Sequence, residues 1–208
     1  MVERFFKYYL LILPGIIMML IALIIIDNPG YTHRFWQSAA PRYVYYYLEG
    51  RHPTGVSSGK SNRLDFSRLE PGDILLAGNS QSCYGHFTHA GIYLGEGRVL
   101  EGYVDCGISR QPLDHYRSYD WACILRVRIP EAKRRQAVEY ALKQEFKTFY
   151  PAAFKGGENY WNCTKLIWEA FRRQGVDLDS FGDLWVTPDY IFRSPHVELV
   201  AGDGELPL

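Results

Sequence analysis

The longest apolar run of the chain extends from Tyr8 to Ile26 and contains no charged residue. Its length is close to the roughly 20 residues that a helix needs to cross the hydrocarbon layer of a membrane. A cleavable signal would have a shorter apolar region, of about 7 to 15 residues, with a small-residue cleavage site close behind it. A buried core helix also fits poorly, because the run has no polar face. The pattern therefore predicts a transmembrane helix in an anchor over residues 1–27.

Charges on the two sides of this run predict its orientation. Arg4 and Lys7 precede it, whereas Asp27 follows it. Basic residues concentrate on the cytoplasmic side of membrane spans. We therefore expect a single-pass protein with its N-terminus in the cytoplasm and its folded domain on the extracytoplasmic side.

Residues 28–63 form a connecting segment between the apolar run and the rest of the chain. Its first part is aromatic, with Trp36 and the run from Tyr43 to Tyr47, a composition found at membrane–water boundaries and in ordinary packing surfaces. Its last part, from Pro53 to Asn62, is rich in Gly, Ser and Pro and is typical of a linker. One globular domain is expected over residues 64–208.

Short apolar runs and helical periodicity alternate with turn residues through this domain. The pattern predicts strands over Ile74–Ala77, His89–Leu94, Arg98–Tyr103, Cys123–Ile129 and Val197–Val200, and helices over Glu131–Phe146 and Cys163–Gln174. Gly175 is the expected stop of the last helix. Because strands and helices occur in separate blocks, the chain is predicted to be α+β, with an antiparallel sheet packed against helices.

Composition narrows the possible partners. The chain has 23 basic and 23 acidic residues, so no net charge attracts it to nucleic acid. Its four cysteines are far apart and form no CxxC pair, which gives no local spacing for a zinc site. A disulfide-rich scaffold is equally disfavoured at this count and length. We therefore expect no nucleic-acid partner, no metal and no cofactor.

Cys163 is the first candidate for chemistry. It is expected in the first turn of a helix, directly after Asn162 as the cap. Unpaired backbone N–H groups and the helix dipole stabilise a thiolate at that position. The thiolate is the nucleophilic form, and a nearby histidine would complete its activation. Position alone leaves a buried structural cysteine as an equal alternative.

His89 and Glu101 are brought together by the expected hairpin. If the loop is Gly95–Gly97, with Gly97 in the left-handed conformation of a bulge, Gly91 pairs with Glu101. His89 and Glu101 then lie on one face as diagonal neighbours, about 7 Å apart at the backbone. A two-residue loop would place Glu101 on the other face. An acidic residue beside the imidazole would orient it and stabilise its charged form.

Three segments, LEPGDILLA, HAGIYLGEGRVLEG and NCTKLIWEAF, resemble the circularly permuted branch of the NlpC-type papain-like cysteine hydrolases, most of all the YiiX/YebB-like group. The ending VTPDYIFRSPHVELV is similar too, and the likeness covers Leu69 to Val200. It implies a permuted papain-like fold, with Cys163 as nucleophile, His89 as base and Glu101 as orienting residue. It also implies an amide, peptide or ester substrate, with cell-envelope material as a candidate.

Further site residues are less closely defined. The Cys163 backbone N–H is a natural oxyanion donor. Tyr84 and Gln81, in the loop before His89, are candidates for a second donor, and Tyr103 at the end of the Glu101 strand is a candidate substrate contact.

Two other functions stay open. The hairpin is also similar to that of lecithin:retinol acyltransferase-like proteins, but those have a second histidine where this chain has Glu101. A lipid-derived acyl substrate, transferred or hydrolysed, is therefore the first alternative to a peptide-derived one. The second is a non-catalytic, membrane-tethered binding module, in which Cys163 would form a disulfide with Cys83, Cys106 or Cys123.

Overall fold

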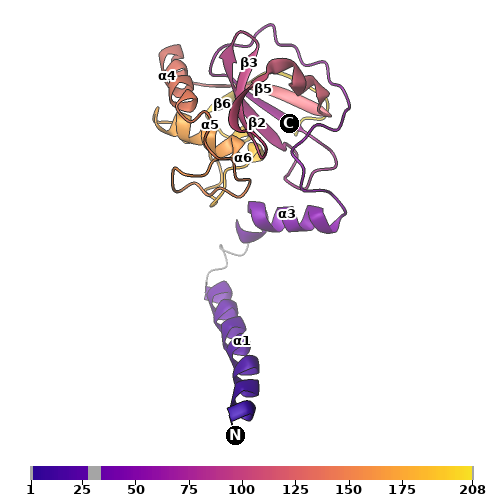
Figure 1. The fold of residues 1–208 in the computed structure, drawn as a ribbon, viewed down its shortest axis with the longest axis vertical. Helices are drawn as coiled ribbons and strands as arrows, with labels where there is room; N and C mark the ends of the chain where they lie inside the picture. The colour runs from indigo at the N-terminus through magenta and orange to yellow at the C-terminus, as the bar shows by residue number, and fades with distance from the viewer. Residues whose placement is uncertain (1, 28–33, 208) are drawn as a thin grey trace. The chain divides into compact units, whose positions relative to one another are not determined.

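The computed structural model of the protein describes residues 2–27 and 34–207 (Figure 1). The chain divides into two compact units, residues 1–41 and 42–208. In the first unit, α1 (Val2–Asp27) continues through Pro14 without a break. The part of the predicted connecting segment at residues 28–33 lies outside the described residues. The division into 1–27, 28–63 and 64–208 stays a prediction.

A helix does form over the apolar run, but a membrane span is not found. Within the ranges that the structure describes, no helix is both long enough and apolar enough to cross a membrane. The transmembrane helix predicted for residues 1–27 is therefore not supported. A run of apolar helix formers is necessary for such a span but does not establish one. The predicted orientation and location of the chain stay predictions.

The second unit begins within α3 (Ala39–Leu48) and contains one six-stranded sheet. Every neighbouring pair of strands is antiparallel, and the order is β4-β3-β2-β1-β5-β6. The strands are β1 (Ile74–Gly78), β2 (His89–Gly95), β3 (Arg98–Tyr103), β4 (Gly107–Pro112), β5 (Trp121–Val127) and β6 (Val197–Asp203). This confirms the predicted α+β class with an antiparallel sheet.

The central strands of the sheet are buried on both faces. On one face, α4 (Glu131–Leu142) and α5 (Cys163–Arg172) pack against β2. Figure 1 shows both helices beside the sheet. On the other face lies the short 3-10 helix η1 (Leu113–Ser118), whose Tyr116 belongs to a second hydrophobic cluster. Burial on both faces explains why β1 is a continuous apolar run without alternation.

Several elements differ from the prediction. Strand β4, η1 and α6 (Pro188–Phe192) were not predicted, because their sequences are polar or very short. Helix α4 ends at Leu142 instead of Phe146, and Phe146 adopts a left-handed φ of 68° that ends any helical run. Helix α5 ends close to Gly175, as expected.

The β2–β3 hairpin has the predicted register but a different turn. Gly91 lies opposite Glu101, as predicted, whereas Arg98 pairs with Gly95 and not with Leu94. The loop is the pair Glu96-Gly97, with φ values of 53° and 69°, the signature of a type I′ turn. This loop is one residue shorter than the predicted one. A bulge between Tyr93 and Gly95 adds one residue to β2 and so restores the predicted register. Glu101 therefore stays on the His89 face.

Gly91 is the position on β2 where a side chain would not fit. A Cβ there would lie 2.4 Å from Val99 Cγ1 and 2.5 Å from Tyr116 Oη. We expect Gly91→Ala to destabilise the fold by about 1–3 kcal/mol, the usual range for overpacking. Chemical unfolding measures this loss, and Gly97→Ala, which has open space but a positive φ, is the comparison for backbone strain alone. Equal losses in the two variants would contradict overpacking at Gly91.

Candidate active site

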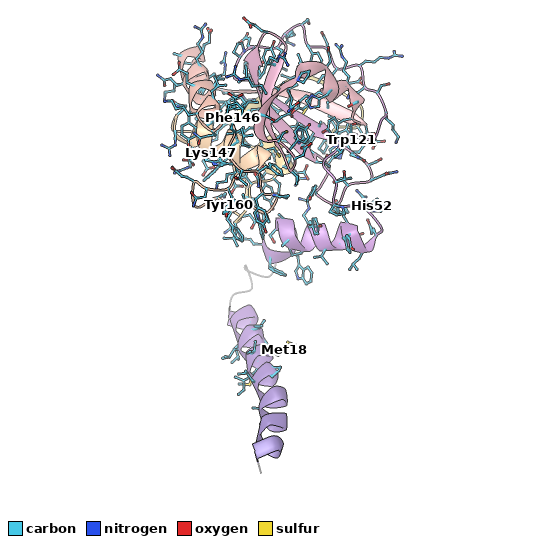
Figure 2. The ribbon with its side chains drawn as sticks, viewed as in Figure 1. Met18, His52, Trp121, Phe146, Lys147 and Tyr160 are labelled. Carbon is cyan, nitrogen blue, oxygen red and sulfur yellow. The ribbon has the colours of Figure 1, made fainter. Side chains whose placement is uncertain are left out.

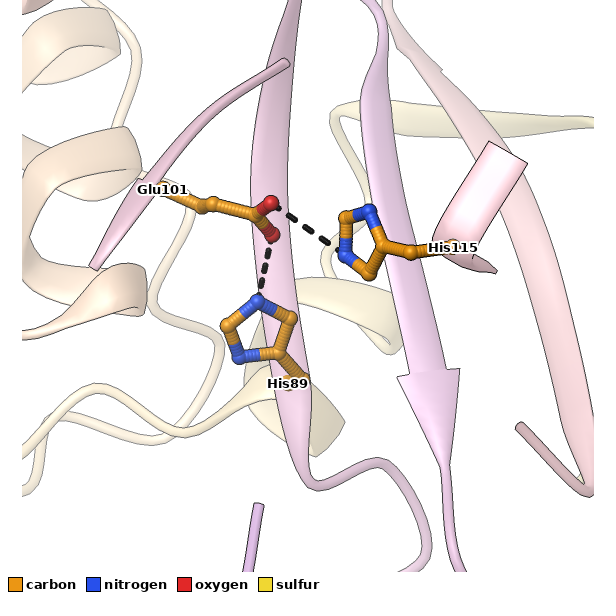
Figure 3. A group of neighbouring side chains, drawn as sticks. All are labelled: His89, Glu101 and His115. Carbon is orange, nitrogen blue, oxygen red and sulfur yellow. Dashed lines mark hydrogen bonds and ion pairs between the residues drawn. The ribbon is translucent and has the colours of Figure 1, made fainter. Parts of the chain in front are cut away.

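The hairpin places His89 and Glu101 in direct contact. His89 Nε2 lies 2.5 Å from Glu101 Oε2, and both residues are buried (Figure 3). His89 stands at the start of β2 and Glu101 near the end of β3, so their side chains cross diagonally between the strands. The predicted proximity of these two residues is thus found, with the carboxylate at the ring nitrogen that would orient the imidazole.

Glu101 has two further neighbours from η1. Tyr116 donates its hydroxyl to Glu101 Oε2 at 2.9 Å. His115 Nε2 lies 3.2 Å from Oε1, and His115 Nδ1 is 2.5 Å from the carbonyl of Pro112. His115 was missed in the sequence because it lies in a segment without a periodic pattern. Its only signal is its place among aromatic residues, His115-Tyr116 and Tyr119.

Burial and nearby charges have opposite effects on the pKa values of His89 and Glu101. Burial disfavours the imidazolium, but Tyr119, Glu101 and Cys163 more than offset it, so the pKa of His89 lies well above its usual value. Burial likewise disfavours the carboxylate, yet His89 and His115 lower the pKa of Glu101 below its ordinary value. The arrangement therefore favours a charged imidazolium next to a carboxylate.

Cys163 is the first residue of α5, as predicted. The helix begins with Asn162 as its cap, whose Oδ1 accepts the Lys165 N–H at 2.7 Å. The Cys163 thiol is half-buried, and a side-chain hydrogen bond with it contributes to the raised pKa of His89. Since Nε2 of His89 is occupied by Glu101, Nδ1 is the nitrogen left for the thiol. The contribution of the thiol to this pKa indicates that Cys163 is near His89.

Two of the three secondary candidates lie near the thiol. Tyr84 and Tyr103 both have raised pKa values, caused first by burial and in part by the charge of Cys163. The Tyr103 ring stacks on His89, with 4.8 Å between centroids. Gln81 is exposed, and its backbone carbonyl accepts the His52 N–H. The structure thus brings Tyr84 and Tyr103 to the site and records no contact of Gln81 with it among the described residues.

Asp189 on α6 shapes the loop that leads into His89. Its Oδ1 accepts the Phe87 N–H at 2.8 Å, and its Oδ2 accepts the His86 N–H at 3.1 Å. Arg42 of α3 pairs with the same Oδ2 at 3.3 Å. A Cβ at Gly85 would lie 2.5 Å from this oxygen, so glycine is required there. Sequence reasoning missed Asp189, although the Thr187-Pro188-Asp189 turn signalled a fixed helix start.

All four cysteines are free thiols in this structure. Cys83 and Cys123 are buried, Cys106 is exposed and Cys163 is half-buried. The disulfide that the binding-module alternative required is therefore not seen at Cys163.

Comparison with known proteins shows the family of the chain. Residues 68–200 match the family model described as permuted papain-like amidase enzyme, YaeF/YiiX, C92 family. The chain belongs to this family. Family membership supports an enzyme of the hydrolase type, more narrowly an amidase, and a permuted papain-like fold. The finer placement in the NlpC clan and the YebB-like likeness stay predictions.

Two individual proteins are similar to this chain. The uncharacterized protein YycO of Bacillus subtilis (strain 168) is 25% identical over 153 residues, which are 70% of this chain and 61% of YycO. The chain thus spans less than two thirds of that relative. The crystal structure of metalloprotein yiiX from Escherichia coli O157:H7 aligns with a TM-score of 0.54 and 15% identity, over 65% of this chain and 98% of yiiX. That likeness concerns the fold alone.

Proposed function

We propose that the protein hydrolyses an amide or related acyl bond through a thioester on Cys163. Two observations support the proposal: His89 Nε2 lies 2.5 Å from buried Glu101, and the Cys163 thiol contributes to the raised pKa of His89. A nucleophile, a base and an orienting acid in that order are the parts of a cysteine hydrolase site.

Each residue has a defined role in the proposed reaction. His89 holds the proton of the Cys163 thiol, and the thiolate attacks the substrate carbonyl carbon. The tetrahedral oxyanion accepts a hydrogen bond from the Cys163 backbone N–H at the start of α5. His89 then gives its proton to the leaving amine or alcohol, which leaves a thioester. Water attacks this thioester with His89 as base, releases the acid and restores the thiol. Glu101 stabilises the imidazolium in both steps.

Trapping the intermediate is the direct test. The full chain is mixed with amide and ester substrates, quenched in acid, digested and measured by mass. The proposal expects an acyl adduct on the peptide that contains Cys163 and none on the peptide that contains Cys106. An adduct absent from Cys163 for every substrate that is turned over would refute the thioester.

The reactivity of the thiol gives an independent prediction. We expect iodoacetamide to modify Cys163 at least about tenfold faster than Cys106, although Cys106 is the more exposed thiol. The reason is that a thiolate next to an imidazolium reacts and a neutral thiol does not. Peptide mass after timed quenching measures both rates in one sample, with Cys106 as the internal control. Faster modification of Cys106 would speak against the ion pair.

A pocket beside α5 keeps a lipid-derived substrate as the second candidate. It has a volume of about 200 Å³, and its lining includes Tyr150, Phe154, Tyr160 and Lys165. Lys165 fixes its wall by donating to the carbonyls of Gly157 at 2.8 Å and Tyr160 at 2.9 Å. An aromatic wall suits an apolar acyl chain as well as an apolar peptide side chain. Cell-wall muropeptides and phospholipids, offered in parallel, separate the two.

A further inference from the structure

His115 is a second histidine at Glu101 that acyl transfer does not require. Its imidazole comes from η1, whereas His89 and Glu101 come from β2 and β3 (Figure 3). One ligand-type atom from each of the three residues lies within 4.8 Å of the other two. The three residues are not close in sequence, so no short sequence motif predicts the group. We call them the His89–Glu101–His115 cluster.

The tautomer of His115 is fixed from outside the cluster. Its Nδ1 lies 2.5 Å from the Pro112 carbonyl oxygen, which only accepts hydrogen bonds, so Nδ1 carries the proton. In the neutral ring, Nε2 then presents a lone pair. That atom lies 3.2 Å from Glu101 Oε1, which makes no hydrogen bond to any residue in the described part of the chain. When the ring is neutral, its Nε2 lone pair therefore faces the buried, unpartnered Oε1 of Glu101.

The spacing of these acceptors fits a shared cation. Two ligands of one tetrahedral Zn²⁺, with bonds of about 2.0–2.2 Å, are separated by roughly 3.3–3.6 Å. The observed 3.2 Å between His115 Nε2 and Glu101 Oε1 is close to the lower end of that range. His89 Nε2 is the third ligand atom, and its 2.5 Å contact with Oε2 is a hydrogen bond that must open by about 1 Å.

The surroundings also have the form of a metal site. Two neutral imidazoles and one carboxylate are a donor set for divalent first-row transition metals. The outer contacts that usually orient such ligands are present: Pro112 holds Nδ1 of His115, and Tyr116 donates to Glu101 Oε2. The His115 side chain is 26% exposed while Glu101 is fully buried, so an ion would enter from the His115 side.

We propose that the His89–Glu101–His115 cluster binds a divalent transition-metal ion, and that this ion and the catalytic His89–Glu101 pair exclude each other. Exclusion follows because His89 Nε2 cannot hold an ion and a proton toward Glu101 at once. Without an ion, Tyr103 Oη, 3.2 Å from His115 Nε2, supplies the hydrogen bond that this nitrogen accepts. Binding does not depend on the proposed thioester chemistry.

Zn²⁺ alone is the probe, and direct binding is the readout. The full chain carrying Cys163→Ala, which removes the thiol as a competing ligand, is treated with chelator and titrated with Zn²⁺ in equilibrium dialysis. We expect one ion per chain, and an affinity at least about tenfold lower after His115→Gln or Glu101→Gln. His196→Gln, at an exposed histidine outside the cluster, is the matched control and should leave affinity unchanged.

Folding and exclusion are checked separately. Thermal unfolding without Zn²⁺ identifies a variant that fails to fold, and Glu101→Gln, which keeps the side-chain shape, then carries the test. In the wild-type chain, Zn²⁺ should slow iodoacetamide labelling of Cys163, and His115→Gln should remove most of that protection. Unchanged Zn²⁺ affinity in both His115→Gln and Glu101→Gln overturns the site. Unchanged labelling with intact binding overturns the exclusion, and neither result bears on whether Cys163 is acylated.

Discussion

Cys163→Ala is expected to abolish turnover, with a loss of roughly 10⁴-fold or more in kcat. Without Sγ no thioester can form, and the remaining oxyanion donor and binding contacts supply only a small residual rate. The measurement is release of product from muropeptides and phospholipids by wild type and variant under identical conditions. Whichever substrate class is consumed only by the wild type is the class that the enzyme cleaves.

Cys106→Ala is the matched control for this experiment. Cys106 is exposed, and its thiol lies 3.2 Å from the Ser109 hydroxyl. Its replacement should leave kcat and KM unchanged. Turnover that survives in Cys163→Ala at the wild-type rate would remove Cys163 from the mechanism, whatever the substrate.

The hairpin shows what could and could not be predicted from the sequence. Pairing of Gly91 with Glu101 was predicted from a three-residue loop, which places His89 and Glu101 on one face, and the structure has this pairing. The turn was predicted wrongly, since two glycines around Glu96 are compatible with either loop length. A bulge compensates for the shorter loop. Register was thus determined by which residues must be buried, and the turn adapted to it.

His115 and Asp189 show why the rest of the site was missed. Both act through contacts with residues distant in the chain: His115 through Glu101, and Asp189 through the backbone of His86 and Phe87. Local periodicity carries no information on such contacts. By contrast, Cys163 could be placed from local signals, because a capping asparagine and an apolar stripe define the start of α5.

The second large effect is expected for Glu101→Gln. Glutamine keeps the shape of the side chain and still offers an oxygen to His89 Nε2, but it removes the negative charge. The imidazolium then loses the partner that stabilises it in a fully buried position. We expect kcat to fall by roughly 10²–10⁴-fold, the usual range for losing the support of a general base, with little change in KM.

Tyr116→Phe distinguishes the effect of the Glu101 charge from the effect of the groups around it. It removes the hydroxyl that donates to Oε2 at 2.9 Å but leaves the carboxylate and its contact with His89 in place. Losing one hydrogen bond to a buried charged group should reduce stability by about 1.5–3 kcal/mol and lower kcat much less than Glu101→Gln does. Steady-state kinetics and chemical unfolding of the two variants measure the changes in kcat and in stability. If Tyr116→Phe lowers kcat as far as Glu101→Gln, the charge of Glu101 is not sufficient for catalysis without the hydrogen bond from Tyr116.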